Sequence, residues 1–248
     1  MPEVPALRRS VAILRQLAGS NRPVSAGALA RGLTIPRSSI YELLSVLDEL
    51  GLVAKVGTGY MLGAGVSELG SAYARTNPLQ RLAQPIVRQL AESADGTAQL
   101  AVLRGWETVY IGKEQAMRSV AVITAAGVRM PAYLTATGRA MLAQLPKREV
   151  LGLFTGEREF VNRTGRGPQT VRELNSELAH VRTRGFAVER GEVTDGIWTI
   201  GASVLDALDR PVAGIGLCLP DAQWSDETES RMASLVRHAA AELTARLR

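Results

Sequence analysis

The sequence predicts an α+β protein in two parts: a small N-terminal part of helices with a β hairpin, and a larger part in which helices flank a mainly antiparallel sheet. Three helical patterns fall within the first fifty residues and are followed by two short strand patterns. Beyond residue 77, strand patterns and helical patterns occur together. The length of 248 residues is sufficient for two domains that each bury a core.

Composition places the chain among ordinary globular proteins. Hydrophobic residues make up 46% and charged residues 21%, which argues against long disorder. No apolar run approaches 18 residues and the N-terminal segment lacks an apolar signal core, so we expect a cytoplasmic protein that does not insert into a membrane. One cysteine, Cys218, and two histidines, His180 and His238, give neither an internal disulfide nor a recognisable zinc cluster. We therefore expect no metal and no other cofactor.

The first three helices are predicted from apolar spacing and from capping residues. The first helix begins near residue 7, the second follows Ser25 as its cap and ends at Gly32, and the third starts with Pro36 and stops at Gly51. Apolar residues mark the inner face of the first helix at Leu7, Val11, Leu14, Leu17 and Ala18, and that of the third at Ile40, Leu43, Leu44, Leu47 and Leu50.

The connection between the second and third helices is short and begins with glycine, as is typical of a helix-turn-helix. Residues 52–56 and 60–62, joined by a glycine-rich tip, predict the two strands of a wing. Over residues 1–63 the sequence thus predicts a winged helix-turn-helix that binds DNA. The alternative is a three-helix unit used for protein contacts, but the hydroxyl-rich third helix and the net charge of +3 over residues 1–77, out of +5 for the chain, favour DNA.

The outward face of the third helix, near its start, carries an arginine and hydroxyls that can reach base edges and phosphates. Glu42 is the exception, because a carboxylate repels phosphate. It either accepts a hydrogen bond from a cytosine amino group or pairs with a neighbouring arginine. The candidate DNA-binding residues are Ser25, Pro36, Arg37, Ser38, Ser39, Tyr41, Glu42 and Lys55.

Five segments, spread from the N-terminal helices to the last strands, resemble the IclR family of bacterial transcriptional regulators, so the resemblance extends over almost the whole chain. They are ALRRSVAILRQLAG, SAGALARGLTIPRSSIYELLSVLDELGLV, GYMLGAGVSELG, TATGRAMLA and GEVTDGIWTIGASVLDALDRPVAGIGLCLP. The resemblance implies a linker helix over residues 64–77 and a GAF-like effector-binding and oligomerisation domain over residues 78–248. It also implies a repressor that binds double-stranded operator DNA as a homodimer or dimer of dimers, under the control of a small-molecule effector such as a small carboxylate or an aromatic acid.

The second part has its own pattern of helices and strands. A helix is predicted past residue 78, then strands over residues 99–103, 108–111, 120–123, 187–190, 199–205 and 212–219. Further helices are predicted over residues 138–144, 147–154 and 171–184, and from residue 226 onward.

Side chains alternate on the strand around Thr199, so Ile197 and Thr199 share one face and Trp198 lies on the other. If Thr199 lines a pocket, Trp198 packs against helices or another subunit. Glu189 matches an acidic position of the family's pocket, although an acid at a strand end is as often solvated. A turn at residues 127–128 offers backbone amides to an anion, although it can equally be a plain turn. The candidate effector-binding residues are Tyr110, Gly127, Val128, Glu189, Ile197, Thr199, Gly216 and Cys218.

The second part also departs from the family's pattern. Thr199 stands where a cysteine is common, Gly216 and Cys218 stand where paired serines are frequent, and Arg139 stands where lysine is usual. With fewer hydroxyls, this pocket is suited to a different or more apolar effector.

Two alternatives concern the role of the second part. An enzyme would need a cysteine or serine beside a histidine, but His180 and His238 fall on a predicted surface helix and on the terminal helix. We therefore do not expect an enzyme. The other alternative is that the second part only oligomerises and binds no ligand, and the sequence is compatible with it.

Overall fold

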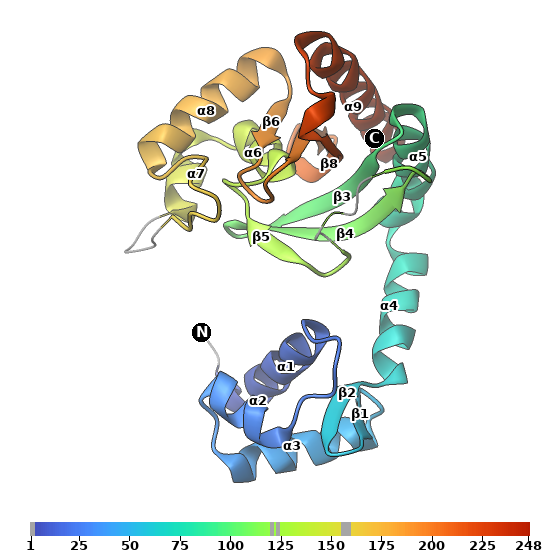
Figure 1. Cartoon of the computed structure of the whole chain (residues 1–248), viewed down its shortest axis with the longest axis vertical. Helices are drawn as coiled ribbons and strands as arrows, with labels where there is room; N and C mark the ends of the chain where they lie inside the picture. The colour runs from blue at the N-terminus through green and yellow to red at the C-terminus, as the bar shows by residue number, and fades with distance from the viewer. Residues whose placement is uncertain (1–2, 120–121, 123–124, 155–159) are drawn as a thin grey trace. The chain divides into compact units, whose positions relative to one another are not determined.

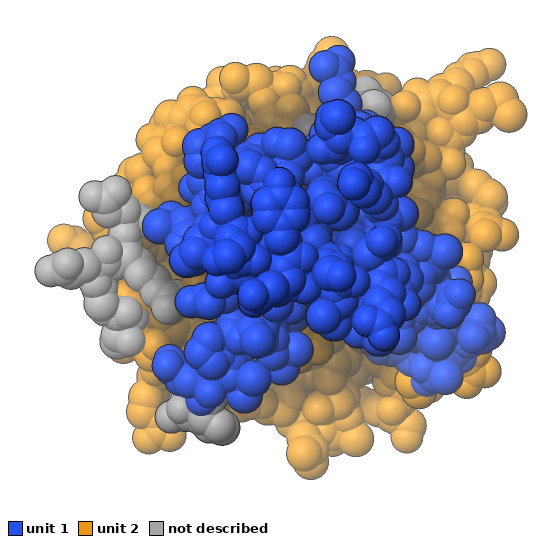
Figure 2. Space-filling model, turned by 90° about the horizontal axis from the view of Figure 1, so that it is seen from below, with its two compact units in different colours: residues 1–77 blue, residues 78–248 orange. Residues whose placement is uncertain are grey.

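The computed structural model describes residues 3–119, 122, 125–154 and 160–248 (Figure 1). Contacts divide the chain into two compact units, residues 1–77 and 78–248, which are coloured separately in Figure 2. Each unit has its own hydrophobic core. None of the described helices is both long enough and apolar enough to span a bilayer.

The N-terminal unit is a winged helix-turn-helix, as predicted. The side chains of Ile13, Leu29, Ile40 and Leu44 are fully buried in its core. Val24, just before the second helix, pairs with Tyr60 in the second strand of the hairpin through two backbone hydrogen bonds of 2.9 Å. The elements are α1 (Pro5–Ala18), α2 (Ala26–Leu33), α3 (Arg37–Glu49), β1 (Val53–Val56), β2 (Gly59–Leu62) and α4 (Ala64–Thr76).

The buried face of α1 differs in part from the predicted one. Ile13 and Leu17 are buried, whereas Leu7 is 62% exposed and Ala18 is also exposed. More than one stripe on this helix satisfies a spacing of three and four, and the stripe that contains Ile13 is the one that faces the core.

The predicted ends of two helices were wrong by one residue. Helix α2 continues past Gly32 to Leu33, and Thr34 takes the left-handed conformation after it, with φ 53°. Gly32 therefore lies within the last turn of α2, where the side-chain amide of Gln16 from α1 lies beside it. Pro36 is the capping residue before α3 and not its first helical residue.

The C-terminal unit contains a six-stranded sheet in the order β5-β4-β3-β8-β7-β6, and every neighbouring pair is antiparallel. Strand β5 was not predicted. The predicted strand over residues 120–123 lies outside the described residues except for Val122. The strands are β3 (Thr97–Arg104), β4 (Glu107–Gln115), β5 (Arg129–Pro131), β6 (Ala187–Arg190), β7 (Ile197–Leu205) and β8 (Pro211–Pro220).

Helices cover both faces of this sheet (Figure 1). One face carries α5 (Pro78–Ala94) and α9 (Asp226–Leu247), which bury the apolar side chains of β7 and β8. The other face carries α6 (Ala136–Gln144), with α7 (Lys147–Leu153) and α8 (Val171–Arg184) packed around it. A short 3-10 helix (Asp221–Gln223) precedes α9.

Glycines let the start of α6 lie directly on the sheet. A Cβ at Gly201 on β7 would lie 2.6 Å from the backbone of Ala136, and a Cβ at Gly216 on β8 would lie 2.7 Å from Thr137 Cγ2. Any side chain at these positions would push the helix away. The sheet and the first turn of α6 therefore form adjoining walls of one small space.

Candidate DNA interface and effector cavity

The outward face of α3 is exposed as the sequence analysis expects. Arg37, Ser38, Tyr41 and Glu42 are exposed and Ser39 is half-buried. The opposite face of the same helix fills the core of the unit. The start of α3 therefore presents a cation and hydroxyls to solvent, which are groups that contact phosphates and base edges.

The other DNA-binding candidates flank this face. Ser25 caps α2, where its hydroxyl oxygen accepts a hydrogen bond of 3.2 Å from the backbone N–H of Ala28. Its hydroxyl proton stays available to a phosphate. Pro36 is exposed just before α3, and Lys55 is exposed on β1 of the wing.

A further cation joins this surface. Terminal nitrogens of Arg31 on α2 and Arg37 on α3 come within 3.6 and 3.8 Å of where a Cβ at Gly27 would lie. Two guanidinium groups over one glycine repel each other and favour an anion between them. Arg31 was not among the predicted residues, because its approach to Arg37 depends on how α2 crosses α3.

A small cavity lies between the sheet and the start of α6. Every sheet strand except β5 contributes a polar side chain to its lining. The space in which the centre of a water molecule can lie is about 20 Å³. It is lined by Gln99, Tyr110, Val122, Thr135, Ala136, Glu189, Val193, Thr194, Ile197, Thr199 and Cys218.

The structure brings five of the eight predicted effector-binding residues together here: Tyr110, Glu189, Ile197, Thr199 and Cys218. The other three lie outside the lining. The N–H of Gly127 donates to the carbonyl of Tyr110 at 2.7 Å and the carbonyl of Val128 accepts from Tyr110, so this turn is joined to β4. Gly216 lies beneath Thr137 and makes room for α6.

Several lining residues were missed by sequence reasoning. Gln99 is 1% exposed in the mainly apolar β3, and a buried amide in such a strand is a usable signal. Thr135 caps α6, so its hydroxyl was recognisable as a helix start. Its place beside the cavity depends on the chain path and could not be read from the pattern.

Burial suppresses ionisation throughout the cavity. It raises the pKa of Glu189 to about 7. The hydrogen bond from the Val193 N–H lowers this pKa, and the negative charge of nearby Glu192 raises it. Burial likewise raises the pKa of the Cys218 thiol to about 12 and raises the pKa of Tyr110 above its ordinary value. Thr199 donates a hydrogen bond of 3.3 Å to Cys218 Sγ. The cavity is therefore suited to binding and not to nucleophilic attack.

The histidines do not complete a catalytic site. His180 on α8 and His238 on α9 are both exposed, while Cys218 is buried in the sheet. Within the described ranges, no group of three or more His, Cys, Asp or Glu side chains is arranged to hold a metal ion.

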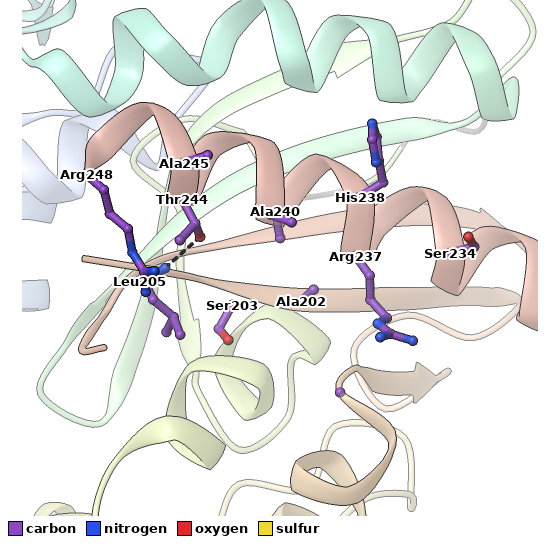
Figure 3. A pocket seen from close by; sticks show the side chains of 12 residues that line it. Ala202, Ser203, Leu205, Ser234, Arg237, His238, Ala240, Thr244, Ala245 and Arg248 are labelled. Carbon is purple, nitrogen blue, oxygen red and sulfur yellow. Dashed lines mark hydrogen bonds between the residues drawn. The ribbon is translucent and has the colours of Figure 1, made fainter. Parts of the chain in front are cut away.

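A larger groove runs along α9 and β7 (Figure 3). Its volume is about 740 Å³, and in Figure 3 Arg237 points from α9 toward the strand whereas His238 points away. Thr244 accepts a hydrogen bond of 3.1 Å from the backbone N–H of Leu205 at its floor. None of the predicted effector-binding residues lines this groove.

Comparison with known proteins assigns both parts of the chain to one family. The helix-turn-helix domain model of the IclR family matches residues 6–57, and the model for the C-terminal part of bacterial IclR transcriptional regulators matches residues 71–245. The chain is 27% identical over 248 residues to the transcriptional repressor IclR of Escherichia coli (strain K12), covering 98% of this chain and 89% of that protein.

Solved structures share the architecture. The Thermotoga maritima IclR structure is 26% identical with a TM-score of 0.77, covering 97% of this chain and 98% of that one. An IclR homolog from Microbacterium hydrocarbonoxydans, complexed with 4-hydroxybenzoate, shares the fold at 20% identity with a TM-score of 0.79, covering 98% of each chain. These relatives are transcriptional regulators and not enzymes. The chain therefore belongs to the IclR family of bacterial transcriptional regulators, with a DNA-binding helix-turn-helix domain followed by the family's effector-binding domain.

Proposed function

We propose that this regulator represses transcription from a palindromic operator, as a homodimer or dimer of dimers, and that a small carboxylic acid in the cavity changes its operator binding. Residues 1–63 bind DNA, residues 64–77 form the linker, and residues 78–248 bind the effector and oligomerise. The observation that carries the proposal is the small cavity with several polar side chains between sheet and helix, in a chain that also exposes a basic recognition face. Such a protein acts in the cytoplasm, where bacterial operator DNA lies.

The proposed effector class is supported by the cavity's chemistry. Donors such as the hydroxyls of Tyr110 and Thr135 can meet carboxylate oxygens, and the homolog complexed with 4-hydroxybenzoate has the same fold. The present volume of about 20 Å³ admits about one water molecule, whereas ligand pockets usually hold about 300–1,000 Å³. Effector binding therefore has to move the walls, and we propose that the linker helix carries this movement to the paired recognition helices.

A thermal-shift screen of small carboxylates and aromatic acids tests the effector role. A rise in melting temperature with one of these acids supports an effector-binding domain. If no acid shifts the transition and none changes operator affinity, the C-terminal unit serves oligomerisation alone.

Replacing Arg37 by alanine is expected to lower operator affinity by at least about tenfold, because an arginine is lost from the recognition face. If Arg37 contacts base edges, the variant also loses discrimination between operator and mismatched sites. Lys55→Ala is expected to weaken binding to all sequences alike and to reduce the salt slope by about one. Fluorescence anisotropy with an operator selected from random duplexes measures both, and unchanged affinity in both variants would falsify the assignment.

Arg31 and Arg37 are expected to act on one phosphate. Each alanine variant then loses most of the shared contact, so the double variant weakens binding by clearly less than the product of the two single effects. The affinities of the wild type, both single variants and the double variant for an arbitrary 30-base-pair duplex at low salt complete this double-mutant cycle. Arg246→Ala, which removes an exposed charge from α9, is the matched control. Multiplicative effects would mean that the two arginines contact separate groups.

A further inference from the structure

One buried arginine stands directly behind the effector cavity. Arg139 on α6 is 1% exposed, and it donates hydrogen bonds to the carbonyls of Val188 at 2.6 Å and Tyr133 at 3.4 Å. A guanidinium group keeps its charge in proteins, so a buried one needs an acidic partner. Arg139 was recognised from the sequence only as a departure from the family's usual lysine.

Two acids flank this cation, at the two sides of the turn that follows β6. Both terminal nitrogens of Arg139 donate to Glu192 Oε1, at 3.2 and 3.1 Å. Glu189 is 3% exposed and lines the cavity, where its Oε1 accepts a hydrogen bond of 3.0 Å from the backbone N–H of Val193. Glu192 therefore forms the ion pair with Arg139, and the hydrogen-bond partners of Glu189 are neutral groups.

Glu189 is buried while the nearby cation of Arg139 pairs with Glu192, and this favours the neutral form of Glu189. Thr199 has one hydroxyl proton, and it donates to Cys218 Sγ at 3.3 Å. Thr199 is also a hydrogen-bond partner of Glu189, and this bond lowers the pKa of the carboxyl group. Burial outweighs the hydrogen bonds from Val193 and Thr199 and raises the pKa of Glu189 to about 7.

We propose that Glu189 and Glu192 compete for the single buried cation of Arg139, and that Glu192 holds it, so that Glu189 lines the effector cavity as a neutral carboxylic acid and recognises an effector carboxylate by donating a hydrogen bond. The inference rests on the proposed effector role of the cavity.

The other charged groups around Glu189 favour the same recognition. Tyr110 from β4 and Cys218 from β8 face it as neutral groups, because burial raises the pKa of both. The charge of Lys113 on β4 acts on Cys218 and slightly lowers the pKa of its thiol. While Glu189 stays protonated, an effector carboxylate therefore meets an additional proton donor and no anionic side chain in the lining, and an O–H donor to a carboxylate makes a short, strong bond. Ionisation of Glu189 replaces this bond with repulsion.

NMR titration of full-length protein labelled with ¹³C at glutamate carboxyl carbons tests the charge sharing, with Glu189→Gln identifying the signal. In the wild type, Glu189 is expected to titrate near pH 7. In Glu192→Gln the midpoint is expected to fall by at least about one pH unit, because Arg139 becomes available to Glu189. Glu177→Gln removes an acid that lies in the same outer groove as Glu192, and it is the control expected to leave the midpoint unchanged. A wild-type midpoint in the ordinary carboxyl range, or no shift in Glu192→Gln, overturns the proposal.

Calorimetry tests the recognition itself, with 4-hydroxybenzoate as the probe. At pH 8, in two buffers of different ionisation enthalpy, binding is expected to take up close to one proton, and Kd is expected to rise about tenfold per pH unit above 7. Binding without proton uptake overturns the neutral-acid proposal. If the probe and its small carboxylate analogues do not bind from pH 6 to 8, the proposed effector class fails, whereas the NMR midpoint still decides the charge sharing separately.

Discussion

Replacing Trp198 by alanine is expected to lower the free energy of unfolding by roughly 3–5 kcal/mol. Its side chain is fully buried between the sheet and the pair α5 and α9, and its Nε1–H donates a hydrogen bond of 3.0 Å to the carbonyl of Pro220. The substitution leaves a large void and an unpaired carbonyl in the core. Urea denaturation followed by circular dichroism measures the loss.

The neighbouring residue provides the matched control, because its side chain lies on the opposite face of β7. Thr199→Val keeps the shape of the side chain and removes a hydrogen bond, so we expect a loss of about 1 kcal/mol. Ligand-free operator binding should be unchanged, while the response of the operator complex to a bound acid is reduced, as it also should be in Glu189→Gln. A loss as large as that of Trp198→Ala, together with a normal effector response, would show that the two faces have been assigned the wrong way round.

Alternation along a strand is local, which is why the sequence predicts the faces of β7 correctly. The bounds of α8 are predictable for a similar reason. Thr170 accepts a hydrogen bond of 3.1 Å from the N–H of Glu173 at one end, and Gly185 takes φ 78° at the other. Both signals depend on residues within a few positions of the helix end.

Contacts between distant segments are what the sequence does not predict. Gly32 is a residue typical of a helix end, but it lies inside α2, beside the side chain of Gln16 from another helix. The burial of Arg139 depends on Val188 and Glu192, which lie 49 and 53 residues away along the chain. For the same reason Gln99 and Thr135 were missed in the cavity, whereas Thr199 and Cys218 were found from the strands that carry them.

The double variant Glu189→Gln/Glu192→Gln is expected to be far less stable than the two single variants together suggest. Each single variant leaves one acid for Arg139, so each is expected to change the free energy of unfolding by only about 1 kcal/mol. The double variant buries the guanidinium without an anion, and breaking a buried pair in this way costs roughly 3–5 kcal/mol.

Urea denaturation of the wild type, both single variants and the double variant at pH 8 gives the coupling energy directly. Adding Arg139→Met to the double variant removes the unpaired charge and should recover most of the lost stability, because an apolar side chain of similar length fits a buried site. Additive effects of the two glutamine substitutions would mean that Glu189 cannot reach the cation when Glu192 is gone. The acid in the effector cavity would then be independent of the ion pair behind it.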